Sequence, residues 1–388
     1  QLLEAIGILD RLQRTLVPAP LAVDFSKTVV TKDSADSRRL NQRGARTLEL
    51  ALGDTYRLAL PEIIDLLHAN DFGIPPHLLP AVLDLSNAAR RAGSYEFARR
   101  LFALSGSQGN WLASQHPDWK DLLPPEDWDA EFKRVVMPAQ RGELLRRWRT
   151  VAPRAARTAL EGVWSTLKPK QQETILPALR IGLSADDQDF LNEALRPKRK
   201  EVRRIATLLL LEIPDVDCYA ELHALAADWL KTDGPRTWFE VNKADVGILE
   251  NYGLNTAKKS PEENLLANLP PRVWLEITGL SVIEFVPRLV TAGKQLLQAL
   301  LRAIIYYEAA EWRMLLVRHF IYQDRPQAEL SKLTEELYAQ LTREEYEEIV
   351  AWSLKNVEQV FRTGSVLRTI SLQLDHPWPD QLSKLFVN

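Results

Sequence analysis

The segment from Ser184 to Pro214 constrains the fold more than any other part of the chain. Its sequence, SADDQDFLNEALRPKRKEVRRIATLLLLEIP, predicts two helices joined by a short basic turn. Ser184 with Asp187 three residues later resembles a capping box, so the first helix begins there. Pro197 ends that helix because proline has no amide donor and its ring clashes with the preceding turn. Apolar residues recur at helical spacing on both sides of the turn: Phe190, Leu191, Ala194, Leu195, Val202, Ile205, Ala206, Leu209 and Leu210.

A helix–turn–helix unit with Val-Arg inside its second helix is typical of a HEAT-type repeat. The periodicity predicts further short helices upstream, over 128–136, 141–149, 153–167 and 169–183. Consecutive short helices with turns of a few residues are the pattern of a solenoid, in which each pair buries its face against the next. We therefore expect an all-α fold, a HEAT-like α-solenoid built as a right-handed stack of antiparallel helix pairs, with irregular insertions. Strands should hold fewer than about a tenth of the residues.

Composition shifts divide the chain into four expected regions. These are an N-terminal helical region (1–105), a HEAT-like repeat core (106–231), an irregular connection (232–270) and a C-terminal helical region (271–388). The connection mixes Gly, Asn and Lys without a clear period, which is compatible with a long loop or a local hairpin. We also expect a helix over 2–16, a loop over 21–37 and a docked apolar tail at 385–387.

Composition excludes several classes of site. The 388 residues carry a net charge of −3, so the whole molecule has no bulk attraction for nucleic acid or anionic lipid. A single cysteine, Cys218, excludes an internal disulfide and a Cys-based zinc cage. The six histidines are scattered, and no apolar stretch approaches the length of a membrane span. We expect no cofactor, no metal, no membrane partner and a cytoplasmic location.

The segment GSQGNWLASQHPDW, residues 106–119, allows two interpretations. It is either a functional loop, with polar groups beside two indoles, or a structural staple in which the tryptophans fix a helix junction. It lacks the Lys-Ser/Thr of a phosphate loop. The residues in question are Trp111, His116, Asp118 and Trp119.

A basic cluster is the stronger candidate for an interaction surface. Residues 133–157 contain eight Lys/Arg and one Glu, and residues 196–204 contain six Lys/Arg and one Glu. Along consecutive helices these side chains could track a phosphate backbone or an acidic protein face. The alternative is that they cover apolar surface or bond within the helix stack. The acidic stretch 326–350 could pair with them or be solvated. The candidate surface is Arg146, Arg147, Arg149, Lys198, Arg199, Lys200, Arg203 and Arg204.

Catalysis has weaker support. Cys218 lies on an amphipathic pattern that predicts a small buried thiol. Asp127-Trp128, next to the basic run, is the one feature shared with helical-repeat DNA glycosylases. No motif supports a hydrolase, so we assign no catalytic residue.

Five segments carry a resemblance to a known family: GNWLASQHPDW, LLRRWR, ALEGVWS, LRIGLSADDQDFLNEAL and KEVRRIATLLLLEIP. Together they resemble an uncharacterised bacterial family of HEAT-like helical proteins, a domain of unknown function. The chain differs in having His116 where Asn is common, and Pro197-Lys198-Arg199 where an acidic turn is common.

The resemblance implies neighbours rather than a mechanism. Members are often encoded beside MoxR-type AAA+ ATPases, von Willebrand factor A domain proteins and a SWIM zinc-finger protein. The expectation is a non-enzymatic scaffold for a protein partner of this kind. The alternative is a nucleic-acid-binding repeat protein with glycosylase-like activity as its extreme case.

Overall fold

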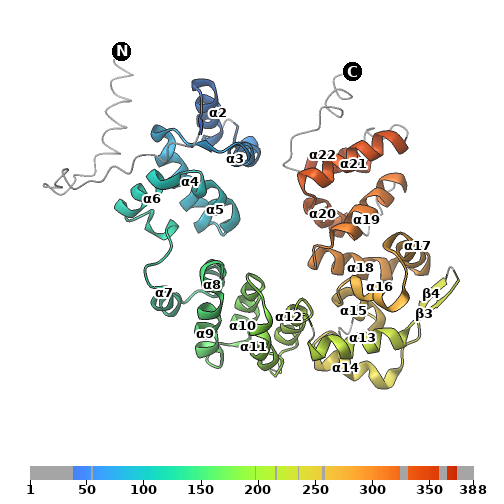
Figure 1. Cartoon of the computed structure of the whole chain (residues 1–388). Helices are drawn as coiled ribbons and strands as arrows, with labels where there is room; N and C mark the ends of the chain where they lie inside the picture. The colour runs from blue at the N-terminus through green and yellow to red at the C-terminus, as the bar shows by residue number, and fades with distance from the viewer. Residues whose placement is uncertain are drawn as a thin grey trace, which may run out of the picture. The chain divides into compact units, whose positions relative to one another are not determined.

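The computed structural model describes residues 38–53, 56–196, 198–214, 216–234, 236–255, 258–323, 331–357 and 365–373 (Figure 1). The helix expected over 2–16, the loop over 21–37 and the apolar tail lie outside these residues. Helices predominate in the described residues, whose four strands are short, and this confirms the all-α class. The chain divides into two compact units, residues 1–123 and 124–388, called here the N-terminal and C-terminal units.

The N-terminal unit is a group of short helices with a minimal strand pair. Its elements are β1 (Arg38–Arg39), α2 (Gln42–Leu52), α3 (Leu60–Ala69), β2 (Phe72–Gly73), α4 (Leu79–Arg91), α5 (Tyr95–Ala103) and α6 (Gly106–Gln115). Strands β1 and β2 pair in parallel. Leu48, Ile64, Val82 and Leu101 meet in its core. Proline near the start of α3 and α4 leaves no hydrogen bond unmade, since the first helical amides have no intrahelical partner.

The C-terminal unit contains the remaining helices and one hairpin. From 124 to 229 it holds α7 (Trp128–Arg134), α8 (Pro138–Val151), α9 (Pro153–Trp164), α10 (Pro169–Ile175), α11 (Gln188–Glu193), α12 (Lys200–Leu210) and α13 (Asp217–Trp229). Short 3-10 turns η5 (Leu176–Arg180) and η6 (Ala185–Asp187) lie between α10 and α11. Then come β3 (Leu230–Asp233), β4 (Arg236–Phe239), α14 (Val246–Asn251), α15 (Pro261–Asn268), α16 (Arg272–Thr278), α17 (Val282–Ala292), α18 (Lys294–Tyr306), α19 (Ala310–Gln323), α20 (Ser331–Ala339), α21 (Arg343–Asn356) and α22 (Val366–Gln373).

The predicted helix–turn–helix at 184–214 is present. Ser184 and Asp187 form the reciprocal capping box at the start of η6, which continues into α11. Phe190, Val202 and Leu209 are buried in the core of the C-terminal unit, and the partly buried Leu195 and Ile205 pack against it. The two helices therefore share one apolar cluster, as the periodicity predicts.

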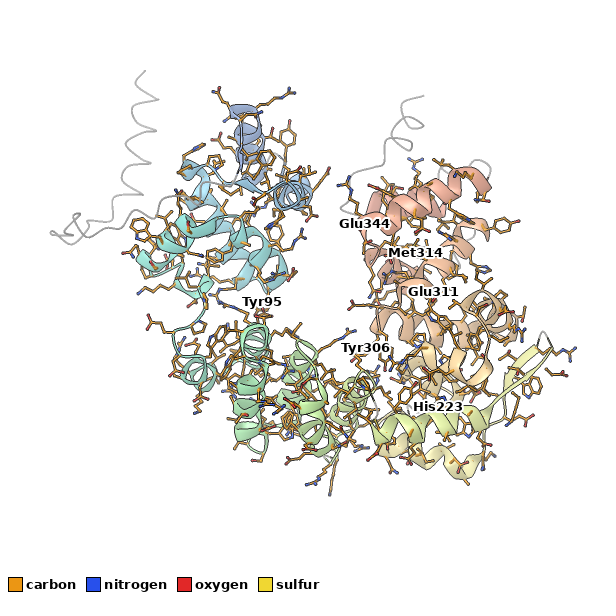
Figure 2. All side chains as sticks on the ribbon, in the orientation of Figure 1. Tyr95, His223, Tyr306, Glu311, Met314 and Glu344 are labelled. Carbon is orange, nitrogen blue, oxygen red and sulfur yellow. The ribbon has the colours of Figure 1, made fainter. Side chains whose placement is uncertain are left out.

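Residues distant in sequence meet at η5. Arg180 donates from Nη2 to the carbonyl oxygen of Tyr306 at 2.8 Å, and its guanidinium lies 5.0 Å from the centre of the Tyr306 ring (Figure 2). It also contacts Glu212 and Glu308. One arginine thus fastens the η5 turn to the end of α18, 126 residues further along the chain.

The expectation of an irregular connection over 232–270 is wrong in part. The local hairpin is confirmed, since β3 and β4 pair antiparallel with Leu230 opposite Phe239. The rest includes the helices α14 and α15, whose Leu249 and Leu265 are fully buried. Helices of six and eight residues are too short to display a clear period, so their apolar positions become recognisable only against a partner.

Gly253, just after α14, shows how closely this segment packs. Its φ is +69°, and a Cβ built there would lie 2.4 Å from the Lys200 carbonyl oxygen and 2.8 Å from the Arg204 amide nitrogen. Both are backbone atoms of α12 and cannot turn aside. Glycine is required here by a close backbone approach as well as by the left-handed conformation.

Replacing Val202 with aspartate tests the core assignment. Val202→Asp places an unpaired carboxylate among apolar side chains, and we expect a loss of roughly 3 kcal/mol or more in the free energy of unfolding. Asn192→Asp adds the same group at an exposed position of α11 and should cost less than about 1 kcal/mol. Urea denaturation of both variants gives the comparison. Equal midpoints would contradict the buried position of Val202.

Replacing Gly253 with alanine tests the close approach to α12. Gly279 is the matched control, because its φ is +66° and a Cβ there meets no atom within 4 Å. Gly279→Ala should cost about 1–2 kcal/mol for the left-handed backbone alone. Gly253→Ala should cost at least about 2 kcal/mol more, because two backbone groups must shift. Thermal unfolding measures both, and similar losses would exclude the steric argument.

Candidate functional site

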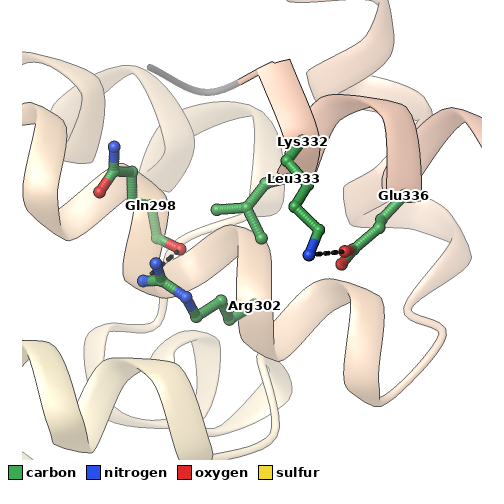
Figure 3. Close-up of a pocket in the computed structure, with 5 residues that line it drawn as sticks. All are labelled: Gln298, Arg302, Lys332, Leu333 and Glu336. Carbon is green, nitrogen blue, oxygen red and sulfur yellow. Dashed lines mark hydrogen bonds and ion pairs between the residues drawn. The ribbon is translucent and has the colours of Figure 1, made fainter.

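An open pocket of about 450 Å³ lies where α18 packs on α20 (Figure 3). Gln298 and Arg302 line it from α18, and Lys332, Leu333 and Glu336 line it from α20. Lys332 lies 3.9 Å from Glu336, which is a weak, exposed ion pair. None of the candidate residues chosen from the sequence lines this pocket.

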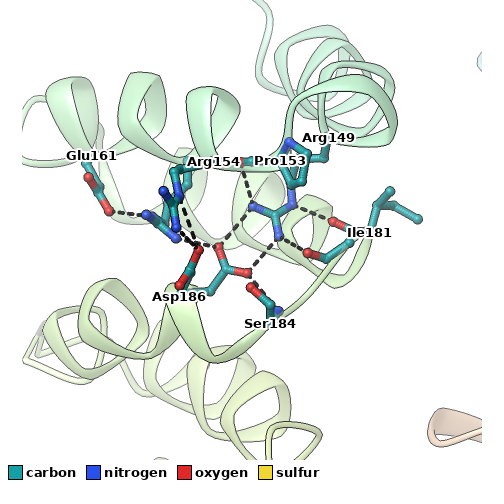
Figure 4. A network of polar contacts seen from close by, with 10 residues as sticks. Arg149, Pro153, Arg154, Glu161, Ile181, Ser184 and Asp186 are labelled. Atoms are coloured by element: carbon teal, nitrogen blue, oxygen red, sulfur yellow. Dashed lines mark hydrogen bonds and ion pairs between the residues drawn. The ribbon is translucent and has the colours of Figure 1, made fainter.

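The most constrained polar group in the described structure is Arg149, near the end of α8 (Figure 4). It forms a bidentate pair with Asp187, from Nη1 to Oδ1 at 3.0 Å and from Nη2 to Oδ2 at 2.8 Å. The two side chains are 0 % and 2 % exposed. Ser184 donates its amide to the same carboxylate at 3.0 Å, and Arg157 lies 3.5 Å from it. Asp187 therefore caps a helix and holds a buried cation at once.

Every N–H of the Arg149 guanidinium has an acceptor. Besides the two bonds to Asp187, Nε donates to the Ile181 carbonyl, Nη1 to Pro153 and Nη2 to Gly182. A guanidinium has five N–H donors, so none is left unpaired by burial. Gly182 supplies one of these carbonyls with φ +62°, a conformation that brings its oxygen to α8 with little strain only for glycine.

The same arrangement recurs later in the C-terminal unit. Arg313 of α19 is 4 % exposed and forms a bidentate pair with Glu345, Nη2 lying 2.7 Å from Oε1. Glu345 also accepts the Thr342 amide at 2.9 Å, and the two residues form the capping box of α21. In both places a buried arginine of one helix bonds the capping carboxylate of a later helix, 38 residues further along the chain for Asp187 and 32 for Glu345. This contact ties the start of a helix to its neighbour.

The inclusion of Arg149 in an exposed interaction surface is wrong. Its position in a basic run suggested solvation, but the last turn of α8 faces the η5–η6 turn, where five acceptors converge. Arg203 donates to the carbonyl oxygens of Lys198 and Glu250, and Arg204 donates from Nε to Asn268 Oδ1 at 2.9 Å. These two arginines follow the alternative interpretation, in which basic side chains bond within the helix stack.

Five predicted surface residues keep some access to solvent. Arg146 is half-buried beside Glu143, and Arg147 lies 5.9 Å from the centre of the Trp128 ring. Lys198 and Arg199 are exposed, with Arg199 3.0 Å from Glu173, and Lys200 is half-buried. Their role as an interaction surface stays a prediction.

In the 106–119 segment, Trp119 has a structural role and Trp111 is exposed. Residues 106–115 form α6 instead of a loop. Trp119 donates from Nε1 to Asp84 of α4 at 2.9 Å, and its ring lies tilted against His116 with the ring centres 4.5 Å apart. The Asp118 carbonyl accepts from Asn87. These contacts confirm the staple for Trp119. Trp111, in contrast, is 47 % exposed, so it is not part of that staple.

Carboxylates of the acidic stretch bind arginines of α19. Glu345 binds Arg313, and Glu348 binds Arg318. The neighbouring Lys332 and Arg343 pair within their own helices. Residues 326–330 lie outside the described part of the chain.

Cys218 and Asp127, the residues considered for catalysis, both have structural explanations. Cys218 is buried, and burial, with the charges of Asp217 and Glu221, raises the pKa of its thiol to about 12, which disfavours the nucleophilic thiolate. Asp127 caps α7 by accepting the amides of Asp129 and Ala130.

The described ranges contain neither a metal-ligand cluster nor a membrane-spanning helix. No group of three or more His, Cys, Asp or Glu side chains is placed to hold a metal ion there. No helix among those residues has the length and apolar character needed to cross a membrane.

The sequence interpretation missed the buried arginine pairs and the pocket. Asp187 was recognisable as a cap, but nothing in its local sequence identifies Arg149, 38 residues away, as its partner. Arg313 and the pocket residue Arg302 stand in apolar stretches with no motif. A charged residue within a largely apolar helix was the available signal.

A double-mutant comparison tests the buried pair. Arg149→Met leaves the Asp187 carboxylate buried without its main partner, and we expect a loss of about 3–5 kcal/mol. In an Asp187→Asn background, which keeps an oxygen for the Ser184 amide, the same change should cost clearly less. Arg154→Met removes an ion pair between α9 and the same turn, η6, whose side chains are 77 % and 51 % exposed, and it should leave the urea midpoint unchanged. Equal effects of Arg149→Met and Arg154→Met would contradict this account.

Comparison with known proteins gives a family and no function. No curated protein and no solved structure matches the chain. One family profile, described as a family of unknown function (DUF5691), matches residues 1–388. The match covers the whole sequence, in agreement with the resemblance to an uncharacterised family. The chain belongs to the DUF5691 family.

Proposed function

We propose that this protein is a non-enzymatic helical-repeat scaffold that binds a protein partner. The observation that carries the proposal is the use of basic side chains inside the C-terminal unit. Arg149, Arg203 and Arg204 bond to groups of neighbouring elements, as repeat-stabilising arginines would. A nucleic-acid-binding surface would instead need such cations free to follow a phosphate backbone.

The order of helix contacts supports a HEAT-like stack as part of this proposal. Helix α8 packs on α7, α9 and α10, and α12 packs on α10, α11 and α13. Further along, α18 packs on α15 as well as on α17, α19 and α20. Contacts among elements close in chain order are characteristic of solenoids, whose exposed faces commonly bind other proteins.

The partner class comes from the family resemblance. It implies a MoxR-type AAA+ ATPase or a von Willebrand factor A domain protein, with the scaffold joining or presenting them. The exposed Lys198 and Arg199 give such a partner a basic contact at the turn before α12. Complementary charge would act mainly on the association rate, because exposed ion pairs add little affinity.

Nucleic-acid binding remains the second function to be measured. No contact in the structure favours it over the scaffold, and the accessible basic residues are interrupted by pairs such as Arg199–Glu173. The two functions differ in their dependence on salt, since binding to a phosphate backbone releases counterions in proportion to the contacts made.

Binding measurements with purified proteins test the proposal. The full chain would be titrated with the ATPase, with the von Willebrand factor A protein and with a fluorescent DNA duplex, each at several salt concentrations. We expect binding to at least one protein and only weak, strongly salt-dependent binding to DNA. Lys198→Glu/Arg199→Gln should slow association with the protein about tenfold.

The control carries the same charge change elsewhere. Arg236→Glu/Lys243→Gln alters two exposed cations of the hairpin region and should leave association unchanged. Failure of the wild-type chain to bind either protein would reject the partner assignment. Specific DNA binding that is lost only in the Lys198/Arg199 variant would establish the nucleic-acid function instead.

A further inference from the structure

Trp111 of α6 presents a large apolar side chain to solvent. It is 47 % exposed, more than any other tryptophan in the described residues, and Trp238 follows with 38 %. Its backbone carbonyl accepts from Ser114, but its indole Nε1 has no hydrogen-bond partner among those residues. Tryptophan at a surface is a typical centre of a protein interface, because its ring buries a large area and its N–H can still be bonded.

The inner face of α6 fixes the direction in which Trp111 points. Ala113 is fully buried, in a small apolar cluster with Leu83 of α4 and Leu122. The helix packs on α4 and α5 (Figure 1). Two residues along a helix correspond to a rotation of about 200°, so Trp111 lies on the face opposite Ala113. The indole is therefore directed away from the core of the N-terminal unit.

The outer face of α6 carries no charge. The helical neighbours of Trp111 on this face are Ser107, Ser114 and Gln115, and all three are exposed. Residues 101–117 contain no Asp, Glu, Lys or Arg, although these types make up 26 % of the chain. An uncharged surface attracts neither a phosphate backbone nor a charged protein face. We call Ser107, Trp111, Ser114 and Gln115 the α6 face.

The charge and shape of the α6 face suit a second copy of itself. Two identical faces that meet on a two-fold axis place each group near the axis opposite itself or a close neighbour. Any charge there would meet a like charge, and the α6 face has none. If two α6 helices run antiparallel about an axis midway between residues 111 and 114, each indole lies over the small Ser114 of the other copy.

The polar groups of the α6 face also match those of a second copy. Gln115 donates from Nε2 to the Ser114 hydroxyl at 2.9 Å, and that hydroxyl donates to the Trp111 carbonyl at 2.7 Å. No described residue donates to the Gln115 Oε1. An indole N–H is a donor only, so Trp111 of one copy can donate to this oxygen of the other. Each copy then supplies one donor and one acceptor.

We propose that the α6 face binds the α6 face of a second copy of this chain, with the two helices antiparallel about a two-fold axis. A helix of 10 residues is about 15 Å long, so the contact is smaller than the roughly 800 Å² per partner of a standard stable interface. The dimer is therefore weak, with a Kd of roughly 10–100 µM. It goes beyond the scaffold function and does not depend on the identity of the protein partner.

Sedimentation velocity of the full chain, over a concentration range that brackets this Kd, tests the proposal. The wild type should shift from monomer to dimer as its concentration rises, and the shift should not depend on salt because the contact is uncharged. Trp111→Ser should weaken dimerisation about tenfold or more. Trp238→Ser is the matched control, since it removes the other exposed indole, from the β3–β4 hairpin, and it should dimerise as the wild type does. Circular dichroism verifies that both variants are folded.

A charge exchange at Ser114 tests the two-fold geometry without removing the indole. Ser114→Glu and Ser114→Arg each place like charges on both sides of the axis, so each variant alone should stay monomeric. An equal mixture of the two should associate again, because opposite charges then face each other across the axis.

Three results would overturn the proposal. They are a wild-type chain that stays monomeric throughout the concentration range, equal dimerisation of Trp111→Ser and Trp238→Ser, and a mixture of the two Ser114 variants that fails to associate. A monomeric wild type whose binding to the ATPase is weakened by Trp111→Ser would assign the α6 face to the protein partner instead of a second copy.

Discussion

The buried bond between an arginine and the capping carboxylate of a later helix is the interaction on which the C-terminal unit most depends. Asp187 must accept from the amide of Ser184, the N-cap residue of its own helix, and from the guanidinium of Arg149 at the same time. Burial makes the pair demanding, because desolvating two charges is repaid only when every donor has an acceptor. Arg149 meets that condition with five bonds. Glu345 and Arg313 form the same arrangement, in which one carboxylate accepts from the cap of its own helix and from an arginine of a neighbouring helix. A single residue therefore fixes both where the helix starts and which helix it packs on.

This interaction also changes how the charge of the chain should be interpreted. The basic run at 133–157 suggested a surface for an anion, yet Arg149, its least exposed member, is buried and pairs with Asp187 of the same chain. Arg147 lies over the Trp128 ring, and Arg203 donates to the backbone carbonyl of Glu250. In contrast, Arg302 lies outside any basic run and has no carboxylate partner in the described residues. Availability of a cation for a ligand is thus decided by its neighbours in space, and local sequence charge is a poor guide to it.

The segment after α13 shows a second way in which packing supplies what local pattern lacks. Helices α14 and α15 are short and their sequence is mixed, but each places leucines in the core. Gly253 allows their connection to touch the backbone of α12 at a distance that excludes any Cβ. The hairpin was predictable as a possibility because its turn contains glycine, whereas the two helices were not, since their stability comes from the surfaces on which they pack.

The sequence by itself determined the all-α class, the helix–turn–helix at 184–214, its capping box and the apolar cluster of Phe190, Val202 and Leu209. These features depend on periods and caps within a few residues, which local chemistry specifies. Only the tertiary structure decided that Arg149 is buried against Asp187, and that Trp111 is exposed while Trp119 is bonded to Asp84. Such outcomes depend on contacts between residues tens of positions apart, and the solvation of each charge follows from those contacts.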